Sequence, residues 1–379
     1  MIGVRGQYLF AFSIADRNDF LIESDLQLLK IVEEAGNVLP TFELVFTLQD
    51  KTVLRYFNEG NVLEISMGED NLEMTSLDFR ILNKLITRIA HNKYLVRLSG
   101  VYDAMEYYTD CKVRVTENIS GVEAILNTVS QYFGIDSNIT KSQDQQYWIQ
   151  PNISDRTFVN NVWAHSWLSD SFPAIGIVSN GIFVLKDVKK LAKTLLTQDY
   201  DWKFVSHDTG KSDELVFDQY KIESNTGLIN VWTGYEREKD VLNLNNGSES
   251  LITPTLNPIL AISNKLDRMP EAGTRASEFG VINENVHPNY WLAYHQNLAY
   301  LALFGSTKIV LQFSSRYADV RVLDLVLLQD IDLDMKQSEG YYSGSYLVSR
   351  VTRAIENRNF VTMVQLNREA LGELQGSFE

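Results

Sequence analysis

Cysteine is almost absent from this sequence, since Cys111 is the one thiol in 379 residues. An internal disulfide is therefore impossible, and a small secreted scaffold held by disulfides is excluded. The first ten residues lack the apolar core of a signal peptide, and no run approaches the roughly 18 apolar residues of a membrane-spanning helix. We expect no membrane span.

Basic side chains are fewer than acidic ones. The chain has 34 lysines and arginines against 49 aspartates and glutamates, a net charge of −15. Sequence-specific nucleic-acid binders usually present a basic face, so this balance disfavours that class. The acid excess could also serve solubility alone. The length favours two to four domains.

The motifs of common enzymes and metal sites are missing. There is no Cys-x-x-Cys, nucleophile elbow, Walker loop or glycine-rich dinucleotide turn, and no histidine pair has metal-ligand spacing on a helix. Asp330, Asp332 and Asp334 alternate with apolar residues, but the glycine and glutamate of a calcium loop are not at the required offsets. This alternation favours a β-strand whose acidic side chains lie on its solvent-exposed face over a metal site. We predict no catalytic residue, metal or cofactor. The five histidines are His91, His165, His207, His287 and His295.

The first hundred residues have the two-residue period of half-buried β-strands. Apolar side chains alternate with polar ones over 41–48 and again over 63–67. Further strands are predicted at 8–14 and 94–98, with a short helix between 51 and 58. This region is therefore predicted to form an antiparallel sheet or barrel.

Helical spacing begins after residue 113. Ser120 and Glu123 have the spacing of a capping box, and Ser154 can cap a second helix whose first turn carries Asp155. On that second helix Phe158, Val162 and Trp163 are predicted to form the core face, with His165 as a packing or polar-face residue. Asn180-Gly181 then predicts a tight hairpin.

The remaining chain is expected to return to strands after an irregular segment. Strands are predicted at 215–223, 228–235, 308–313, 320–328, 346–354 and 360–366, a loop-rich stretch at 243–280, and a helix at 289–304. Trp291, Tyr294, Leu298 and Leu301 would share the apolar face of that helix. Ile89–Val96 and Ile355–Thr362 look alike, which indicates either a duplication or two ordinary polar hairpins.

The amino-acid sequence between residues 152 and 187 resembles that of a known protein family. Asn-Ile-Ser-Asp-x-Thr-Phe-Val, Phe-Pro-x-Ile-Gly and Asn-Gly-x-Phe-Val-Leu-Lys-Asp occur in the order found in baseplate hub proteins of contractile-tailed phages. These hubs are related to the hub part of the valine-glycine repeat spike proteins of type VI secretion. The resemblance implies an α+β, mainly β fold with two tail-tube-like antiparallel β-barrels. The implied divisions are a first barrel at 1–110, an α+β domain at 111–205, a second barrel at 206–240 and 305–370, an insertion at 241–304, and a tail at 371–379.

The resemblance also implies a mechanical function. The chain would be a homotrimeric adaptor that joins the sixfold tail tube, or a tube-initiator protein, to a threefold central spike protein. It would form part of the channel for tape-measure protein and DNA, contact baseplate wedge proteins, assemble in the host cytoplasm and stay in the virion tail. No short Val-Gly repeats follow the last barrel, so we expect a separate spike chain, which favours a phage hub over the hub of a related injection system. The candidate channel-lining acids are Glu43, Glu64, Asp330, Asp332 and Asp334.

Two other functions are consistent with the residues. A tail-associated peptidoglycan hydrolase would need only two carboxyl groups about 5–9.5 Å apart, although no segment resembles a lysozyme. A general adaptor or assembly factor is the other alternative.

Overall fold

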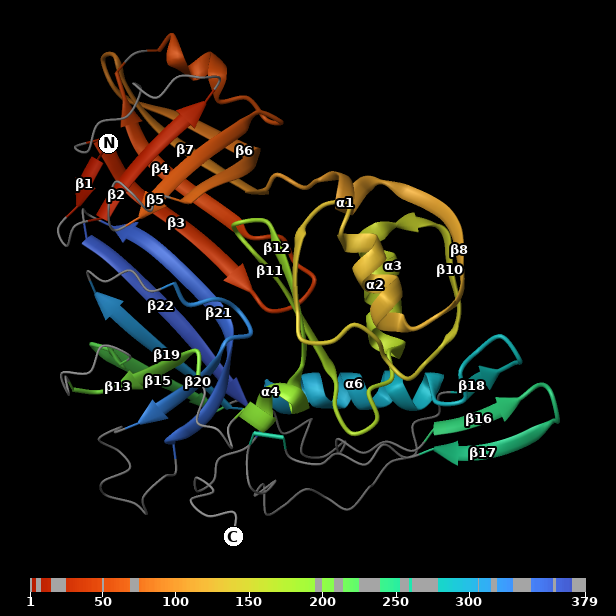
Figure 1. Ribbon diagram of the computed structural model, residues 1–379. Coiled ribbons are helices and arrows are strands. Elements are labelled where there is room, and N and C mark those ends of the chain that lie inside the picture. The colour runs from red at the N-terminus through yellow and green to blue at the C-terminus, as the bar shows by residue number, and fades with distance from the viewer. Residues whose placement is uncertain are drawn as a thin grey trace.

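The computed structural model shows a mainly β protein with a smaller α+β unit at its side (Figure 1). The predicted α+β, strand-dominated class is confirmed. No helix in the described part of the chain is long and apolar enough to cross a membrane. The structure describes residues 2–4, 8–14, 25–49, 51–68, 75–194, 200–207, 214–224, 239–252, 259–260, 279–305, 307–314, 319–329, 342–356 and 359–369.

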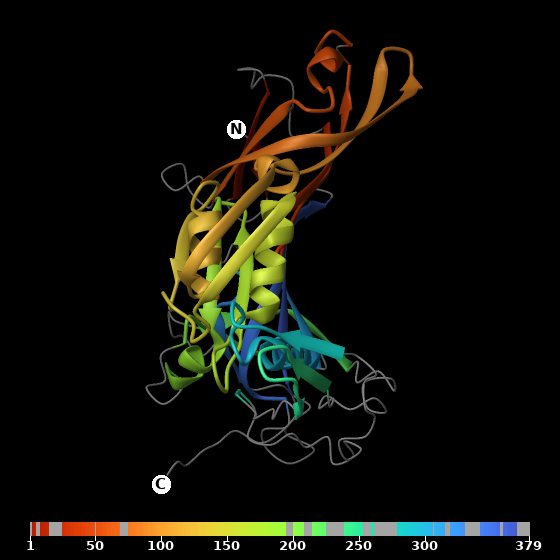
Figure 2. The same cartoon turned by 90° about the vertical axis from the view of Figure 1, so that its right-hand side faces the viewer.

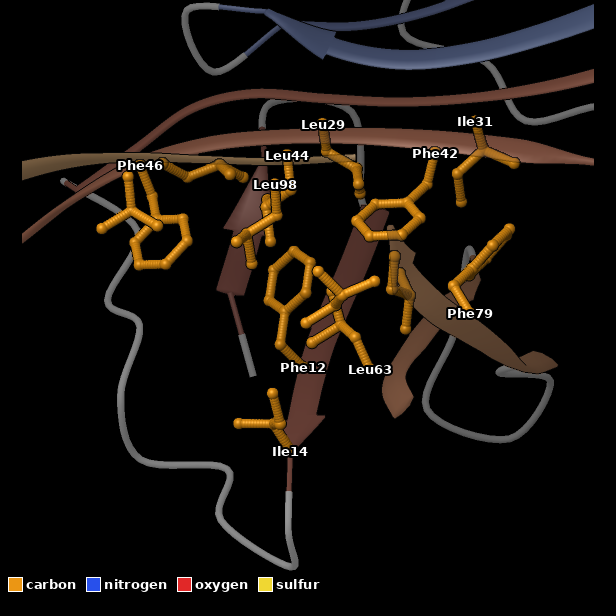
Figure 3. Packing of buried hydrophobic residues seen from close by; sticks show 14 of the residues in the cluster. Phe12, Ile14, Leu29, Ile31, Phe42, Leu44, Phe46, Leu63, Phe79 and Leu98 are labelled. Atoms are coloured by element: carbon orange, nitrogen blue, oxygen red, sulfur yellow. The ribbon is translucent and has the colours of Figure 1, made fainter. Parts of the chain in front are cut away.

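The first sheet is antiparallel throughout, in the order β1-β2-β5-β6-β7-β4-β3. Its alternating side chains point one face into a core that contains Phe12, Phe42 and Phe79 (Figure 3). The four strands predicted in this region are confirmed, whereas the helix expected at 51–58 is a single 3-10 turn, η2 (Val53–Tyr56). The strands are β1 (Ile2–Val4), β2 (Tyr8–Ile14), β3 (Leu26–Glu34), β4 (Thr41–Leu48), β5 (Val62–Gly68), β6 (Thr75–Ala90) and β7 (Lys93–Tyr102).

In the α+β unit two helices are packed between two layers of strands. Helices α2 and α3 lie between the β8–β10 ribbon and a three-stranded sheet, β11-β12-β9 (Figure 1). The capping box of Ser120 and Glu123, the Ser154 cap and the Gly181 turn (φ +77°) are confirmed. The elements are α1 (Glu106–Thr109), β8 (Cys111–Ile119), α2 (Gly121–Val129), β9 (Gly134–Ser137), β10 (Gln146–Ser154), α3 (Asp155–His165), β11 (Pro173–Val178), β12 (Ile182–Asp187) and α4 (Val188–Thr194).

The second sheet has the order β14-β13-β20-β21-β22-β19-β15. It departs from the predicted antiparallel barrel because β13 runs parallel to both β14 and β20. Phe217 N bonds to Val205 O of β13 and Asp218 N bonds to Gln312 O of β19, so the sheet curls until its two ends meet. The predicted strand at 228–235 lies outside the described residues. The strands are β13 (Trp202–Val205), β14 (Glu214–Val216), β15 (Gln219–Ser224), β19 (Thr307–Ser314), β20 (Leu325–Gln329), β21 (Gly344–Glu356) and β22 (Asn359–Arg368).

Between β15 and β19 the chain forms a small sheet and one long helix. β16 (Lys239–Asn243) pairs with β17 (Ser248–Ile252) and β18 (Phe279–Ile282), so part of the expected loop-rich stretch is regular. The predicted helix is α6 (Tyr290–Phe304), but its expected face is wrong, because Leu298 and Leu301 are exposed. The helix instead buries Asn297, whose amide donates to the carbonyl oxygens of Trp163, Ala164 and Ser166 at the end of α3.

The two large sheets are joined edge to edge. Residues 28–34 of β3 pair antiparallel with residues 350–356 of β21, which gives one continuous 14-stranded sheet. Glu33 and Arg353 lie at this junction, and only 2% and 5% of their side chains are exposed. Arg353 Nη1 lies 3.5 Å from Glu33 Oε2. Glu33 also accepts hydrogen bonds from the backbone N and hydroxyl of Ser179 in the β11–β12 turn. Arg353 donates to Val320 O at 2.7 Å. Three parts of the chain therefore meet at one buried ion pair.

Both large sheets contain the same five-strand pattern. The spatial order β5-β6-β7-β4-β3 in the first sheet matches β20-β21-β22-β19-β15 in the second, with every neighbouring pair antiparallel. The similar segments at Ile89–Val96 and Ile355–Thr362 form the central hairpin of each pattern. A β-bulge also occurs at matching places, at Leu82 in β6 and at Ser349 in β21. These agreements favour a duplication over two unrelated hairpins.

The junction predicts a sharp difference between two neighbouring glutamates. Glu33→Ala should destabilise the protein by about 3–5 kcal/mol, because Arg353 would keep a buried charge without its partner. Glu34→Ala is the matched control, since its ion pair with Arg350 is 45% and 41% exposed and such pairs contribute about 0–1 kcal/mol. Urea unfolding measures both. Equal effects of the two substitutions would contradict this account of the junction.

Candidate functional site: assembly surfaces

Helix α3 presents the predicted core residues to the centre of the α+β unit. Phe158 and Val162 are each 1% exposed, in a cluster with α2 and the β11–β12 hairpin. Trp163 is only partly buried at the margin of this cluster, and its indole N–H donates to Pro173 O. It therefore ties α3 to the start of β11.

The first helical residue of α3, Asp155, has a fully buried carboxylate. Lys112 Nζ lies 2.6 Å from it, Arg114 Nη2 3.1 Å and the Tyr132 hydroxyl 2.7 Å. Burial acts to raise the pKa of Asp155, but the hydrogen bonds from Lys112, Tyr132 and Gln150 and the charge of Arg114 outweigh it and lower the pKa. Because protein groups from all sides bind this carboxylate, its role is to hold the β8–β10 ribbon against α3.

A cavity of about 340 Å³ lies where the first sheet, the α+β unit and the second sheet meet. Its described lining is mainly apolar, with Trp163, Phe172 and Phe304 among the walls and Lys308 as the one charged residue among those described. Glycoside hydrolysis by the usual route requires a pair of carboxyl groups, and no carboxyl group is among the described residues that line this cavity. Among the described residues no three His, Cys, Asp or Glu side chains are grouped so as to hold a metal ion.

The candidate channel acids are placed as follows. Glu43 is exposed on β4, between the buried Phe42 and Leu44, so it points away from the core of the first sheet. Glu64 lies on β5 opposite Asp78 of β6 and accepts a hydrogen bond from Ser76. Burial, followed by the charges of Glu64 and Asp103, raises the pKa of Asp78. Asp330, Asp332 and Asp334 lie outside the described residues.

The β8–β10 ribbon carries an exposed apolar stripe. Val113, Val115 and Ile149 are 79%, 55% and 63% exposed, and Tyr147 continues the row. The opposite face of β8 turns Lys112 and Arg114 inward to Asp155. The alternation of apolar and charged side chains in β8 is thus visible in the sequence, but the face that carries the charged side chains is the buried one. Contiguous exposed apolar side chains of this kind mark protein contact surfaces.

A second exposed surface is the arm, which we define as the outer part of the β6–β7 hairpin from Leu82 to Arg97. Figure 2 shows it, in orange, extending beyond the rest of the first sheet. Leu85 and Ile89 on the arm are 57% and 49% exposed. From Phe79 to Tyr102 the sequence has five lysines and arginines and no acid, although the whole chain has a charge of −15. Neither surface was recognised from sequence, although this run of bases was a readable signal.

An aromatic cluster joins α3 to α6 and the β16–β18 sheet. The ring of His165 stacks on Tyr290, with centroids 3.8 Å apart, and on Tyr294 at 5.0 Å. Its Nδ1 donates to Asn161 O at 2.7 Å, and its buried Nε2 has no hydrogen-bond partner among the described residues. Lys239 Nζ lies 4.0 Å from the centroid of the Trp291 ring. His165 is therefore a packing residue.

The comparisons with known proteins find relatives in structure alone. No protein-family model matches the sequence, and no curated protein matches it. The fold is similar to a 43 kDa tail protein of prophage MuSo2 from Shewanella oneidensis, with a TM-score of 0.61, 8% identity, and 95% and 98% of the two chains covered. A tail protein from Neisseria meningitidis MC58 gives a TM-score of 0.57 at 10% identity, covering 96% of this chain and 97% of that one.

A third solved structure connects the fold to secretion machines. It is an Escherichia coli component of the type VI secretion system, described as structurally similar to the T4 phage tail proteins gp27 and gp5. Its TM-score is 0.53 at 7% identity, over 96% of this chain and 78% of that chain. At such identities the similarity establishes the fold, which is that of phage tail and type VI spike or hub proteins.

Truncation of Trp163 tests the margin of the core. Trp163→Ala should destabilise the protein by about 3 kcal/mol, the lower end for a large aromatic residue, because the indole is only partly buried. Asn161→Ala on the exposed side of the same helix should change stability by less than about 0.5 kcal/mol. Chemical unfolding compares the two. A fully stable Trp163→Ala protein would show that this contact is unimportant.

The buried imidazole of His165 should make stability depend on pH. Burial, followed by the nearby charges of Lys239 and His295, lowers the pKa of His165 from 6.5 to about 4 despite the hydrogen bond to Asn161. The unfolded chain takes up this proton below pH 6.5 and the folded chain only near pH 4, so the stabilisation is complete above 6.5 and declines between 6.5 and 4. The full decline is about 3 kcal/mol, at 1.4 kcal/mol for each pKa unit.

His165→Phe keeps the ring stack and removes the titration, so the unfolding free energy of this variant should fall less between pH 7.5 and 4.5 than that of the wild type. His91→Gln at the exposed tip of the arm should retain the wild-type slope. Identical pH profiles for the wild type and His165→Phe would refute this assignment.

Proposed function

We propose that this chain is the structural baseplate hub protein of a contractile phage tail. The observation that carries the proposal is the presence of two large sheets with the same strand pattern, joined through β3 and β21 in one chain. The fold similarity to phage tail proteins supports the same function. The divisions expected from sequence, apart from the tail at 371–379, are proposed as its domains, with the second sheet extended to begin at β13 (Trp202–Val205).

The duplicated sheet would allow one ring to contact both a sixfold and a threefold partner. Three chains with two similar sheets each would present six similar units to a sixfold tail tube, or to a tube-initiator protein. The same homotrimer would offer a threefold face to a central spike protein. Rings of identical chains are the usual closed form of protein assemblies. One chain can therefore connect partners of unlike symmetry without a second gene product.

The excess of acid suits a channel wall. Each chain contributes a net charge of −15, and we expect part of the negative charge of the ring to line the channel. Part of this charge would repel DNA phosphates and let DNA and the tape-measure protein pass without binding, within the roughly 8 Å that physiological salt leaves unscreened. Glu43, Glu64, Asp330, Asp332 and Asp334 remain the candidates. The outward direction of Glu43 is consistent with this role.

The remaining surfaces would serve neighbours in the virion tail. The insertion, with its β16–β18 sheet, is the part best suited to variable contacts such as baseplate wedge proteins, because inserted loops vary on a constant scaffold. The stripe on the β8–β10 ribbon also suits a protein contact.

The hub of a related contractile injection system is the second candidate, and the similarity to the type VI secretion component favours it. A peptidoglycan hydrolase has less support, because no carboxyl group is among the described residues that line the cavity between the two sheets and the α+β unit.

Oligomeric mass tests the hub function most directly. Light scattering on the purified protein should give three times the 43.3 kDa of one chain. Electron microscopy should show a ring with a central opening that binds the tail-tube and spike proteins at opposite ends. A protein that remains monomeric, or a ring that binds neither, would overturn the proposal. Clearing of peptidoglycan that survives stringent purification would overturn the non-enzymatic function.

A further inference from the structure

At the junction between the two large sheets, the two halves of β21 pair with different strands. Its first half pairs with β20, where Leu325 lies opposite Leu347. After the bulge at Ser349, the same side of β21 pairs with β3, from Arg350 opposite Glu34 to Glu356 opposite Leu28. Strands β20 and β3 therefore lie one after the other along the same edge of β21.

The corresponding place in the first sheet is open. Strand β5 pairs with residues 75–80 of β6, and the bulge at Leu82 follows. Beyond it, residues 83–90 pair with β7 on one side only. In the second sheet, β15 is the counterpart of β3, and it pairs with β19 on one side only. Within the described chain no backbone hydrogen bond reaches the free side of either segment. Such edges readily accept another strand.

We propose that β15 of one copy of this chain adds, antiparallel, to residues 84–89 of β6 in the next copy. This contact repeats between chains the β3–β21 junction found within each chain. It rests on the ring in the proposed function and identifies the edges that close it. The contact is head to tail, so that successive copies extend in one direction until the ring closes.

The register follows from the duplication. Gly100 and Leu366 both lie next to the matching bulges, and they pair with Phe42 and Ile309 respectively. Ile31 lies opposite Phe42, and Ile222 lies opposite Ile309, so Ile31 and Ile222 are equivalent.

Ile86 follows the bulge at Leu82 by four positions, as Arg353 follows the bulge at Ser349, so Ile86 and Arg353 are equivalent. Arg353 lies opposite Ile31 in the junction within the chain. Ile86 of one copy therefore lies opposite Ile222 of the next, and Thr87 lies opposite Lys221.

Side chains on the two edges are complementary in this register. Ile86 packs at the margin of the first core and Ile222 at the margin of the second, so the pairing covers both together. The exposed Leu85 comes to lie opposite Glu223, on the outer face. The arm contributes bases without acids, whereas β15 contains Glu223 and is preceded by Asp218, with Lys221 as its one base.

Disulfide cross-linking tests both the edges and the register. In a Cys111→Ser background, T87C and K221C are made as separate chains and mixed under mild oxidation. Both native side chains are exposed, so the fold tolerates the changes, and thermal melting checks this. Opposite residues of an antiparallel pair have Cα atoms about 4.5–5.5 Å apart, within the range of a disulfide. We expect a covalent heterodimer from the mixture and covalently linked rings from the double variant.

The matched control is T87C mixed with Q219C, which moves the thiol two residues along the same face of β15 and should not cross-link. An intact oligomer without the T87C–K221C bond overturns this inference and leaves the proposed function standing. Preferential bonding to Q219C, or T87C bonding to itself, overturns it too. A chain that is monomeric at every concentration overturns the proposed function together with the inference.

Discussion

The pairing of β3 with β21 is the contact on which the rest of the molecule depends. It joins two sheets from opposite ends of the chain, and it buries Glu33 and Arg353 where the turn of the α+β hairpin also arrives. A buried ion pair contributes little net stability, but it strongly penalises any arrangement that separates its members. Its value here is therefore in specifying how three parts of the chain are oriented.

Buried polar side chains connect the parts of this protein in addition to its apolar cores, and several apolar side chains stay exposed on the described surface. Asp155 holds the β8–β10 ribbon through Lys112 and Arg114, and Asn297 satisfies three carbonyl oxygens at the end of α3. Directional bonds of this kind allow few alternative packings. The apolar stripe on the ribbon and the arm of the first sheet then remain available to other chains.

Sequence reasoning succeeded where local rules govern and failed where a distant partner decides. The capping box, the Asn-Gly hairpin and four strands of the first sheet (β2, β4, β5 and β7) were predictable, whereas β1, β3 and β6 were not recognised. The face of α6 was wrong because its buried amides bind carbonyl groups more than 120 residues away. The apolar face of β8 was not recognised as the outer one, since Asp155 draws its basic residues inward. The predicted core residues Phe158 and Val162 are buried, whereas Trp163 lies at the margin.

The sequence by itself determined the local conformations, the absence of internal disulfides and the strand-rich class, because capping, turn formation and alternation depend on residues a few positions apart. Only the tertiary structure decided which strands meet. Glu33 and Arg353 are 320 residues apart, and no periodicity encodes such a pairing. The parallel course of β13, the matching bulges and the open edges of β6 and β15 were also settled by the fold. Strand partnership depends on how whole sheets pack, and a single strand carries little information about its neighbour.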